Sequence, residues 1–364
     1  MLGIITFHDN HNFGAALQCA SLVSVIRGLG HEVKVVDYSY FTQKRSLLKY
    51  WGIRNYGIAN ALKKKVNDWT FGSATISNFR NFRTKFWEQS MPCKSPEDVN
   101  LLVQGFSHVI VGSDQVWRFD RPGPYFLNFG LGYTGIKVSY AACCTSRDQP
   151  QYQLDAIRDW INDIDHVSVR NSFSQEVVEE VSGRKAVEVC DPTLLVDLDI
   201  AGTPSERLPQ KYILAYVLGL SSSKEIPEMI RRAKANFGNL PVVAIRLTID
   251  HYQEYPWADQ VIDGFGPIEW NAAIKNATFF ITDSFHGILF SIKNSTPYFG
   301  FYKDKLRAPR LIDLKDRYRL GNRITNSSEK FKDEFFQAGP NDRDNLYIVR
   351  HREASLSFLE KSLR

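Results

Sequence analysis

Short apolar runs alternate with longer amphipathic segments along most of the chain, which is the pattern of an α/β protein. Leu2–Phe7 is an apolar run typical of a buried strand, and Ala15–Leu29 places its leucines and valines on one helical face. Glu32–Asp37 is again strand-like. A strand, a helix and a strand in this order predict a parallel βαβ unit with a right-handed crossover.

The same alternation continues after about residue 100. Strands are expected at His108–Val111, Lys137–Ala142, His166–Arg170, Val187–Val189, Tyr212–Val217, Val242–Arg246, Thr278–Thr282 and Pro297–Phe301. Helices are expected at Gln151–Ile161, Asn171–Ser182, Ile226–Asn236, Glu269–Asn276, Gly287–Lys293 and 351–363. Ser172 or Ser174 is the candidate cap of the second of these helices.

The chain length of 364 residues suits two domains of ordinary size. Turn formers and charges gather at 197–210, so we place the domain boundary there: residues 1–200 form the N-terminal domain and 201–364, with the final helix, the C-terminal one. A mostly helical insertion at about 41–100 interrupts the first domain. Two α/β domains in tandem leave a cleft between them, and ligands bind at the carboxyl ends of the strands.

The segment ITDSFHG, residues 281–287, ends an apolar strand and begins a helix. Ser284 and the backbone amides of Phe285, His286 and Gly287 would lie at the helix N-terminus, which favours a phosphate or carboxylate. Gly287 would let that ligand approach the backbone, and His286 would bind the anion or transfer a proton. The alternative is a capped helix with a core histidine, and the residue types alone leave both open.

Other polar residues follow strands of the N-terminal half. Arg170 can bind a carboxylate or phosphate through its guanidinium fork, or form a surface salt bridge with a glutamate of the next helix. Asp114 and Trp117 can hold a sugar, or serve as a capping residue and a core residue. Asn12 and Gly14 lie where a polar loop enters a helix, in position to contact a ligand.

Several common sites are missing from the sequence, which has no G-x-G-x-x-G fingerprint, Walker A motif or G-x-S-x-G elbow. His8 and His11 lack a third ligand, so we expect no metal. The five cysteines include no C-x-x-C pair and are expected to be reduced. With neither a long apolar run nor a signal-like start, we expect a cytoplasmic protein.

The net charge of +5 is unevenly distributed. Residues 40–90 contain ten Lys and Arg, two Asp and Glu, and eleven aromatic residues. One interpretation is a pair of helices with solvated basic faces and aromatic core faces; another is a surface that docks on an anionic membrane. Nucleic acid fits least well, because the basic charge is local and no known nucleic-acid-binding module is visible.

The combination of these segments resembles the polysaccharide pyruvyl transferase family. The similar stretches run in order along the chain: GIITFHDNHNFGAALQCASL near the start, VIVGSDQVW at 109–117, VSVRNSFSQEVV at 167–178, CDPTLLV at 190–196, YILAYVLG at 212–219, and the strongest, GPIEWNAAIKNATFFITDSFHGILFSIKNSTPYFGF, at 266–301. Residues 40–100 are the least similar. The resemblance implies two Rossmann-like domains facing a cleft, as in GT-B glycosyltransferases.

The resemblance also implies a reaction. The donor would be phosphoenolpyruvate and the acceptor a saccharide, and the pyruvyltransferase would form a cyclic pyruvate ketal across two hydroxyls and release phosphate, without a cofactor. Acceptors in such pathways are often linked to a lipid diphosphate. The segment 40–90 would then act as a peripheral anchor at the inner membrane face.

By the same resemblance, the site residues divide between the two domains. His286 would be the acid or the phosphate-orienting group, with Arg170 as a ligand of the donor. The remaining donor-side residues would be Ser284, Phe285, Gly287 and Arg310. The acceptor side, in the N-terminal domain, would contain Asn12, Gly14, Asp114 and Trp117.

Two other functions are compatible with this fold. Nucleotide-sugar glycosyltransferases of the GT-B class commonly carry two glutamates about eight residues apart in the C-terminal domain. Here Glu269 is followed at that spacing by Ala277, which disfavours this function. A non-catalytic saccharide-binding protein is the second alternative, and the presence of Arg170 and His286 speaks against it.

Overall fold

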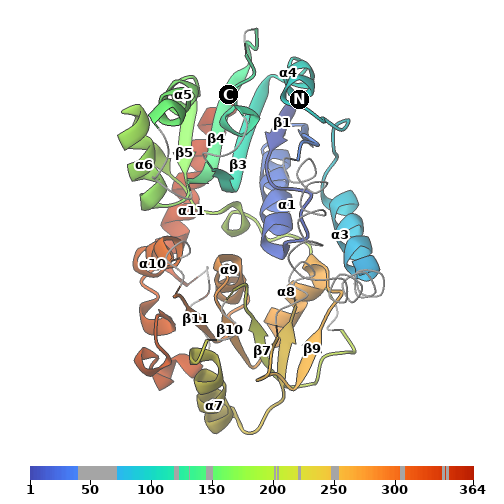
Figure 1. Cartoon of the computed structure of the whole chain (residues 1–364), viewed down its shortest axis with the longest axis vertical. Helices are drawn as coiled ribbons and strands as arrows, with labels where there is room; N and C mark the ends of the chain where they lie inside the picture. The colour runs from blue at the N-terminus through green and yellow to red at the C-terminus, as the bar shows by residue number, and fades with distance from the viewer. Residues whose placement is uncertain are drawn as a thin grey trace.

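The computed structural model describes residues 1–39, 72–118, 123–130, 132–144, 151–200, 202, 205–219, 223–246, 254–303, 308–337, 341 and 344–364. Within these ranges the chain forms two lobes, each built on a parallel six-stranded sheet (Figure 1). The strand order is β2-β1-β3-β4-β5-β6 in the first lobe and β12-β11-β10-β7-β8-β9 in the second. The two α/β domains expected from the sequence are therefore present.

The first lobe begins with the expected βαβ unit, in which β1 pairs in parallel with β2 and Leu2 lies opposite Val33. Its strands are β1 (Leu2–Ile5), β2 (Val33–Val35), β3 (His108–Trp117), β4 (Ile136–Cys144), β5 (His166–Val169) and β6 (Val187–Glu188). Its helices include α1 (Phe13–Gly28), α4 (Pro96–Val103), α5 (Gln151–Asn162) and α6 (Ser172–Ser182). The inner strands β1 and β4 are almost completely buried, as their apolar runs predict.

The second lobe repeats the alternation of strand and helix. Its strands are β7 (Ile213–Tyr216), β8 (Val242–Ile245), β9 (Gln260–Ile262), β10 (Phe279–Thr282), β11 (Tyr298–Phe301) and β12 (Ile324–Thr325). Its helices include α7 (Glu225–Phe237), α8 (Pro267–Asn276), α9 (Phe285–Lys293) and α10 (Ala308–Arg317). The sequence did not predict β9 and β12, which are edge strands of three and two residues, too short to show a period.

Two local predictions are wrong. The strand expected at 108–111 continues through the polar residues to Trp117 as β3, with an irregular register to β4 between Asp114 and Trp117. The cap of α6 is neither Ser172 nor Ser174 but Asn171, whose side chain accepts the Ser174 amide at 2.8 Å. In the first case polar residues expected in a loop belong to a strand, and in the second a residue expected inside the helix is its cap.

Helix α11 (Leu346–Ser362) corrects the predicted domain division, because it packs on the first lobe (Figure 1). The Cys190 amide donates to Ser355 Oγ at 2.9 Å, and the ring of Phe358 lies 6.5 Å from that of Tyr140. Leu359 is fully buried in the same apolar cluster. A helix that the sequence assigns to residues 201–364 thus completes the N-terminal lobe, and both chain ends lie at that end of the molecule.

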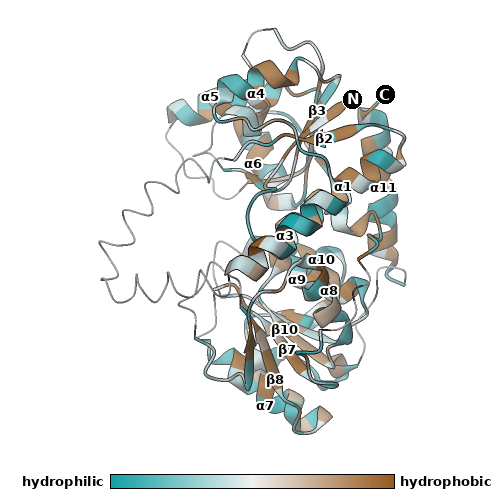
Figure 2. Ribbon diagram, turned by 90° about the vertical axis from the view of Figure 1, so that its right-hand side faces the viewer, coloured by the Kyte–Doolittle hydropathy of each residue, from teal (hydrophilic) through white to brown (hydrophobic). Residues whose placement is uncertain are grey.

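Part of the predicted insertion at 41–100 forms helix α3 (Gly72–Phe86), which lies between the lobes (Figure 2). Its Asn78 side chain donates to the Gly264 carbonyl at 2.9 Å, and Phe79 stacks on Phe13. The aromatic residues Phe79, Phe82, Phe86 and Trp87 are buried, while Arg80 and Lys85 are exposed. This part of the basic-aromatic segment has an aromatic core face and a solvated basic face; residues 40–71 lie outside the described ranges.

Aromatic side chains join the two lobes into one apolar core. Phe13, the first residue of α1, stacks on Trp270 of α8 with 5.5 Å between ring centroids. Tyr216, at the end of β7, contacts both rings. Trp270 is fully buried, and burying an aromatic of this size stabilises the folded state by about 2–3 kcal/mol. This packing stabilises the relative position of the lobes.

Among the helices described, none is long and apolar enough to cross a membrane.

Because α11 packs on the first lobe, Leu359→Ala is expected to lower the free energy of unfolding by about 2–5 kcal/mol through the cavity it leaves. In hydrogen exchange, amides of β4 should lose protection before those of β8. The control is Glu360→Ala, at the exposed neighbouring position, which should change stability by less than about 0.5 kcal/mol. Earlier loss of protection in β8 would contradict this assignment.

Candidate active site between the lobes

Side chains from the ends of four strands meet between the lobes. Asp114 lies in β3, Arg170 follows β5, Asp191 follows β6 and His286 follows β10. Arg170 Nη1 donates to Asp191 Oδ2 at 2.6 Å, and Arg170 Nη2 donates to Asp114 Oδ1 at 3.2 Å. His286 Nε2 lies 3.4 Å from Asp191 Oδ2. We call these four residues the charge cluster.

Arg170 is held by several side chains of the protein. Its Nε donates to Cys143 Sγ at 3.1 Å, and its guanidinium lies 4.4 Å from the centre of the Phe285 ring. The side chain is 2% exposed, which excludes the alternative of a surface salt bridge with a glutamate of α6. Burial alone would lower the pKa of Arg170, but Cys143, Asp191 and Asp114 outweigh it and raise the pKa above its usual value. Arg170 is therefore a buried permanent cation.

Asp191 is the anion at the centre of the charge cluster. Its Oδ1 accepts the amide of Thr193 at 3.0 Å and the Thr193 hydroxyl at 2.7 Å, while Oδ2 faces Arg170 and His286. Burial acts to raise the pKa of Asp191, but the charges of His286 and Arg170 and the bond from Thr193 prevail and hold that pKa well below its usual range. The carboxylate therefore stays ionised although it is completely buried.

Asp114 is the most accessible member of the charge cluster, with its side chain 16% exposed. Its backbone has a φ of 76°, which is uncommon outside glycine and occurs often at functional sites. Burial acts to raise the pKa of Asp114, but Arg170, His286 and Arg310 lower it below the usual value. Arg310, on α10, thus lies close enough to influence this carboxylate.

His286 lies in the first turn of α9, directly at the boundary between the lobes. The helix is capped by Ser284, whose Oγ accepts the Gly287 amide at 3.2 Å. The imidazole packs against Gly14 of α1, so that a Cβ on Gly14 would lie 2.8 Å from the His286 Cβ and closer still to the ring. His286 is 7% exposed, and the alignment of its Nε2 with Asp191 is too poor for a hydrogen bond.

The contact between Gly14 and His286 brings two helix N-termini together. Asn12 caps α1 by accepting the Ala15 amide at 3.1 Å, as Ser284 caps α9. Neither helix has an acidic residue in its first turn. Each cap bond leaves the preceding amides of its helix without an intrahelical acceptor, and both helix dipoles present their positive ends here. The arrangement suits a bound anion.

Trp117, expected on the acceptor side, does not reach the site. It is fully buried in the first lobe, stacks on Phe126, and donates its Nε1–H to the Tyr125 carbonyl at 3.1 Å. Of the two interpretations given by the sequence, the core tryptophan is the one found. The extension of β3 accounts for this, since alternate residues of a strand point to opposite faces.

The two histidines considered as metal ligands have other partners. His8 Nε2 lies 3.1 Å from Asp37 Oδ1, and the His11 ring packs on Phe79. In the described part of the chain, no three His, Cys, Asp or Glu residues gather as they would around a metal ion.

Asp191 is one of the polar residues expected where strands end at the cleft, but the residue types predict no specific role for it or for Cys143, although both contact Arg170. Their signal is positional. Each lies at or just after the carboxyl end of a strand that neighbours β5 in the sheet, so each can reach the residue that follows β5. Strand order, which the sequence does not reveal, is needed to use that signal.

The Gly14–His286 contact predicts the effect of one methyl group. Gly14→Ala should displace the imidazole of His286, shift its NMR signals, and lower the free energy of unfolding by about 1–3 kcal/mol through overpacking. The matched control is Gly28→Ala at the other end of α1, where a Cβ would meet no atom within 4 Å. That variant should keep the His286 signals and gain up to about 1 kcal/mol from helix propensity. Unchanged His286 signals in Gly14→Ala would refute the contact.

Asp191→Asn should lower the free energy of unfolding at pH 7 by about 3 kcal/mol, because Arg170 loses a buried partner. The folded-state pKa of Asp191 lies below its usual value of 3.8, so its ionic stabilisation is complete above that pH and declines as the pH falls further. The difference between variant and wild type in urea unfolding should thus be constant from about pH 5 to 8 and shrink below about pH 4. Asp163→Asn, which removes an exposed partner of Lys137, is the control and should cost less than about 1 kcal/mol. A difference that grew on acidification would contradict the assignment.

Solved structures similar to this chain share its two-lobed architecture. They include the UDP-GlcNAc 2-epimerase of Methanocaldococcus jannaschii in complex with UDP-GlcNAc and UDP, at 10% identity and a TM-score of 0.50, covering 98% of this chain and 92% of that one. S. aureus MnaA with UDP is 13% identical at a TM-score of 0.53, and the match covers 100% of this chain and 96% of that one. The Neisseria meningitidis UDP-GlcNAc 2-epimerase bound to UDP-GlcNAc is 12% identical at a TM-score of 0.51, and the match covers 99% of both chains. At these identities the likeness shows the fold alone, and it confirms the expected GT-B-like arrangement.

The family is identified from the sequence. A search of curated proteins finds no match to it. The profile of the polysaccharide pyruvyl transferase family, in contrast, matches residues 12–304, which span both lobes and contain the whole charge cluster. This confirms the resemblance drawn from the sequence, and the chain belongs to the polysaccharide pyruvyl transferase family.

Proposed function

We propose that this protein transfers the enolpyruvyl group of phosphoenolpyruvate to two hydroxyls of a saccharide, forming a cyclic pyruvate ketal and releasing phosphate. The observation that carries the proposal is the meeting of the α1 and α9 N-termini at Gly14 and His286, beside Arg170. Two helix N-termini and a histidine suit a phosphate, and the family to which the chain belongs transfers pyruvyl groups.

The donor carries a phosphate and a carboxylate, which need separate partners. We assign the phosphate to the first-turn amides of α1 and α9 and to His286. We assign the carboxylate to Arg170 and Arg310. Arg170 has five N–H donors and uses three of them for Cys143, Asp191 and Asp114, so two are left for a ligand. Asp114 and Asp191 offset much of the positive charge, which would keep the trianionic donor from being held too tightly for turnover.

The reaction needs a proton at one carbon of the donor and a nucleophile at its neighbour. In our proposal His286 gives a proton to the methylene carbon, which becomes the methyl group, and a sugar hydroxyl attacks C2 and loses its proton. The C2–O bond to phosphate then breaks, and the second hydroxyl closes the ring with loss of its own proton. Of the two hydroxyl protons, one returns to His286 and the other leaves on the phosphate. Asp114, the most exposed carboxylate of the charge cluster, would accept a hydrogen bond from the attacking hydroxyl. No step requires a cofactor or a metal.

Asp191 supports this chemistry without touching the substrate. It is buried beneath both Arg170 and His286, so it sets the position of the guanidinium and faces the imidazole with negative charge. We therefore assign Asp191 as a positioning residue.

The acceptor side is the less constrained half of the proposal. Asp114 borders the site from the first lobe, and we infer a saccharide acceptor beside it. Asn12 and Gly14, expected on the acceptor side, belong to the α1 N-terminus that we assign to the phosphate. A lipid-diphosphate-linked acceptor at the inner membrane face remains part of the proposal through the basic segment 40–90. The protein should bind liposomes that contain anionic lipid at low salt and release them as the salt concentration is raised. Failure to bind at low salt would contradict the membrane contact.

The nucleotide-sugar glycosyltransferase is the alternative raised by the sequence. The Glu269 carboxylate accepts the Gly266 amide at 3.0 Å, so it serves the N-terminus of α8, and Ala277 occupies the position of a second glutamate. The solved UDP-bound structures contribute the fold only. The other alternative, non-catalytic saccharide binding, differs from our proposal by producing no phosphate.

Calorimetric titration of phosphoenolpyruvate tests the donor. Wild type should bind it, and His286→Ala and Arg170→Lys should each weaken binding by about tenfold or more, since each removes a charge-assisted contact or its fork geometry. The control His31→Ala, a partly exposed histidine beyond the other end of α1, should bind as wild type does. Phosphate release with a saccharide acceptor would complete the case. Binding of a UDP-sugar in place of phosphoenolpyruvate would replace the proposal with the glycosyltransferase.

A further inference from the structure

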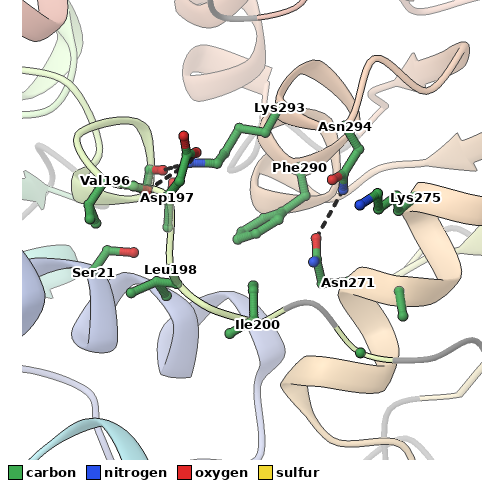
Figure 3. A pocket seen from close by; sticks show the side chains of 13 residues that line it. Ser21, Val196, Asp197, Leu198, Ile200, Asn271, Lys275, Phe290, Lys293 and Asn294 are labelled. Carbon is green, nitrogen blue, oxygen red and sulfur yellow. Dashed lines mark hydrogen bonds and ion pairs between the residues drawn. The ribbon is translucent and has the colours of Figure 1, made fainter.

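A partly open space lies beside the charge cluster, with a volume of about 150 Å³ (Figure 3). Its walls come from α1, from the chain that links the lobes, and from α8 and α9. None of the four residues of the charge cluster lines it. The residues that line it include Ser21, Leu198, Asn271, Lys275, Phe290 and Lys293. We call this space the linker cavity.

The linker cavity contains a polar group that the protein leaves unsatisfied. Ser21 is 1% exposed, its side chain points into the cavity in Figure 3, and its Oγ has no hydrogen-bond partner among the described residues. A buried hydroxyl without a partner costs about 1–3 kcal/mol. Such a group in the wall of a cavity indicates that a ligand atom belongs there.

The charge around the linker cavity is positive. Lys293 Nζ is fully engaged, with the carbonyls of Thr193 at 2.6 Å and Val196 at 2.8 Å and with Asp197 Oδ1 at 3.0 Å. Lys275 makes no such bond to any residue in the described part of the chain, and in Figure 3 its amino group lies at the cavity rim. Two lysines against one aspartate leave one positive charge, which suits a monoanion.

An apolar wall lies between these polar groups. The ring of Phe290 faces the cavity, with Leu198 and Ile200 of the linking chain beside it. A cavity of about 150 Å³ holds a molecule the size of benzene. Most small-molecule sites combine such an apolar wall with a few polar groups that fix orientation.

We propose that the linker cavity binds a small organic carboxylate with an apolar body. The carboxylate would pair with Lys275, and the body would pack on Phe290 with its far edge toward the Ser21 hydroxyl. The ligand would contact both helices that carry the proposed donor site, because α1 contributes Gly14 and Ser21 while α9 contributes His286 and Phe290. It would also lie against Thr193, which holds Asp191. The linker cavity is thus an effector site placed to influence the charge cluster.

Benzoate, benzamide and inorganic phosphate are the probes that test this proposal, by calorimetry and saturation-transfer NMR on the full chain. Wild type should bind benzoate with a Kd of about 1 mM, as befits a ligand of this size. Benzamide, which lacks the charge, and phosphate, which lacks the apolar body, should each bind about tenfold more weakly or worse. Failure of benzoate to saturate the protein at about 10 mM, or equal binding of benzamide, would overturn the proposal.

Variants locate the binding. Lys275→Met, at an exposed position that tolerates the change, and Ser21→Leu, which fills the cavity, should each weaken benzoate binding about tenfold or more. The matched control is Lys361→Met, an exposed lysine at the end of α11, which should bind benzoate as wild type does. His286→Ala should also retain benzoate binding, which separates this site from the donor site. Loss in His286→Ala, or no loss in Lys275→Met, would overturn the placement whatever becomes of the proposed donor.

Discussion

The ion pair between Arg170 and Asp191 is the constraint on which the site depends. Both side chains are almost completely buried, and a buried charge is tolerated only when its partners are close and well oriented. The pair belongs to the first lobe, yet the guanidinium stacks on Phe285 and the carboxylate faces His286, both from the second. The second lobe therefore helps to cover this buried pair, so the electrostatics of the site depend on the packing of the two lobes.

The regular parts of the fold could be predicted because their signals are local. Buried parallel strands such as β7 and β10 are short apolar runs, and the amphipathic helices between them repeat their pattern over several turns. His286 could be found for a related reason. The residues that form an N-terminal helix cap, Ser284 to Gly287, are contiguous in the sequence, so one short stretch reveals the whole device.

The rest of the site depends on contacts between distant segments. Asp114 and Arg170 are separated by 56 positions, and only the strand order brings β3, β4, β5 and β6 into reach of one another. Trp117 points into the core because β3 continues past Gly112. The residue types Gly, Ser and Asp that follow Val111 do not suggest a continuing strand. The bond between Cys190 and Ser355 spans 165 positions, so no window along the chain could place α11 on the first lobe.

The return of α11 to the first lobe has a mechanical consequence. In the described part of the chain, one connection runs from the first lobe to the second around residues 192–212, and another returns between α10 and α11. A lobe attached by a single link can twist and swing about that link in any direction. A lobe attached at two points can turn freely only about the line that joins them. Any motion that admits a substrate is therefore confined to rotation about that one axis.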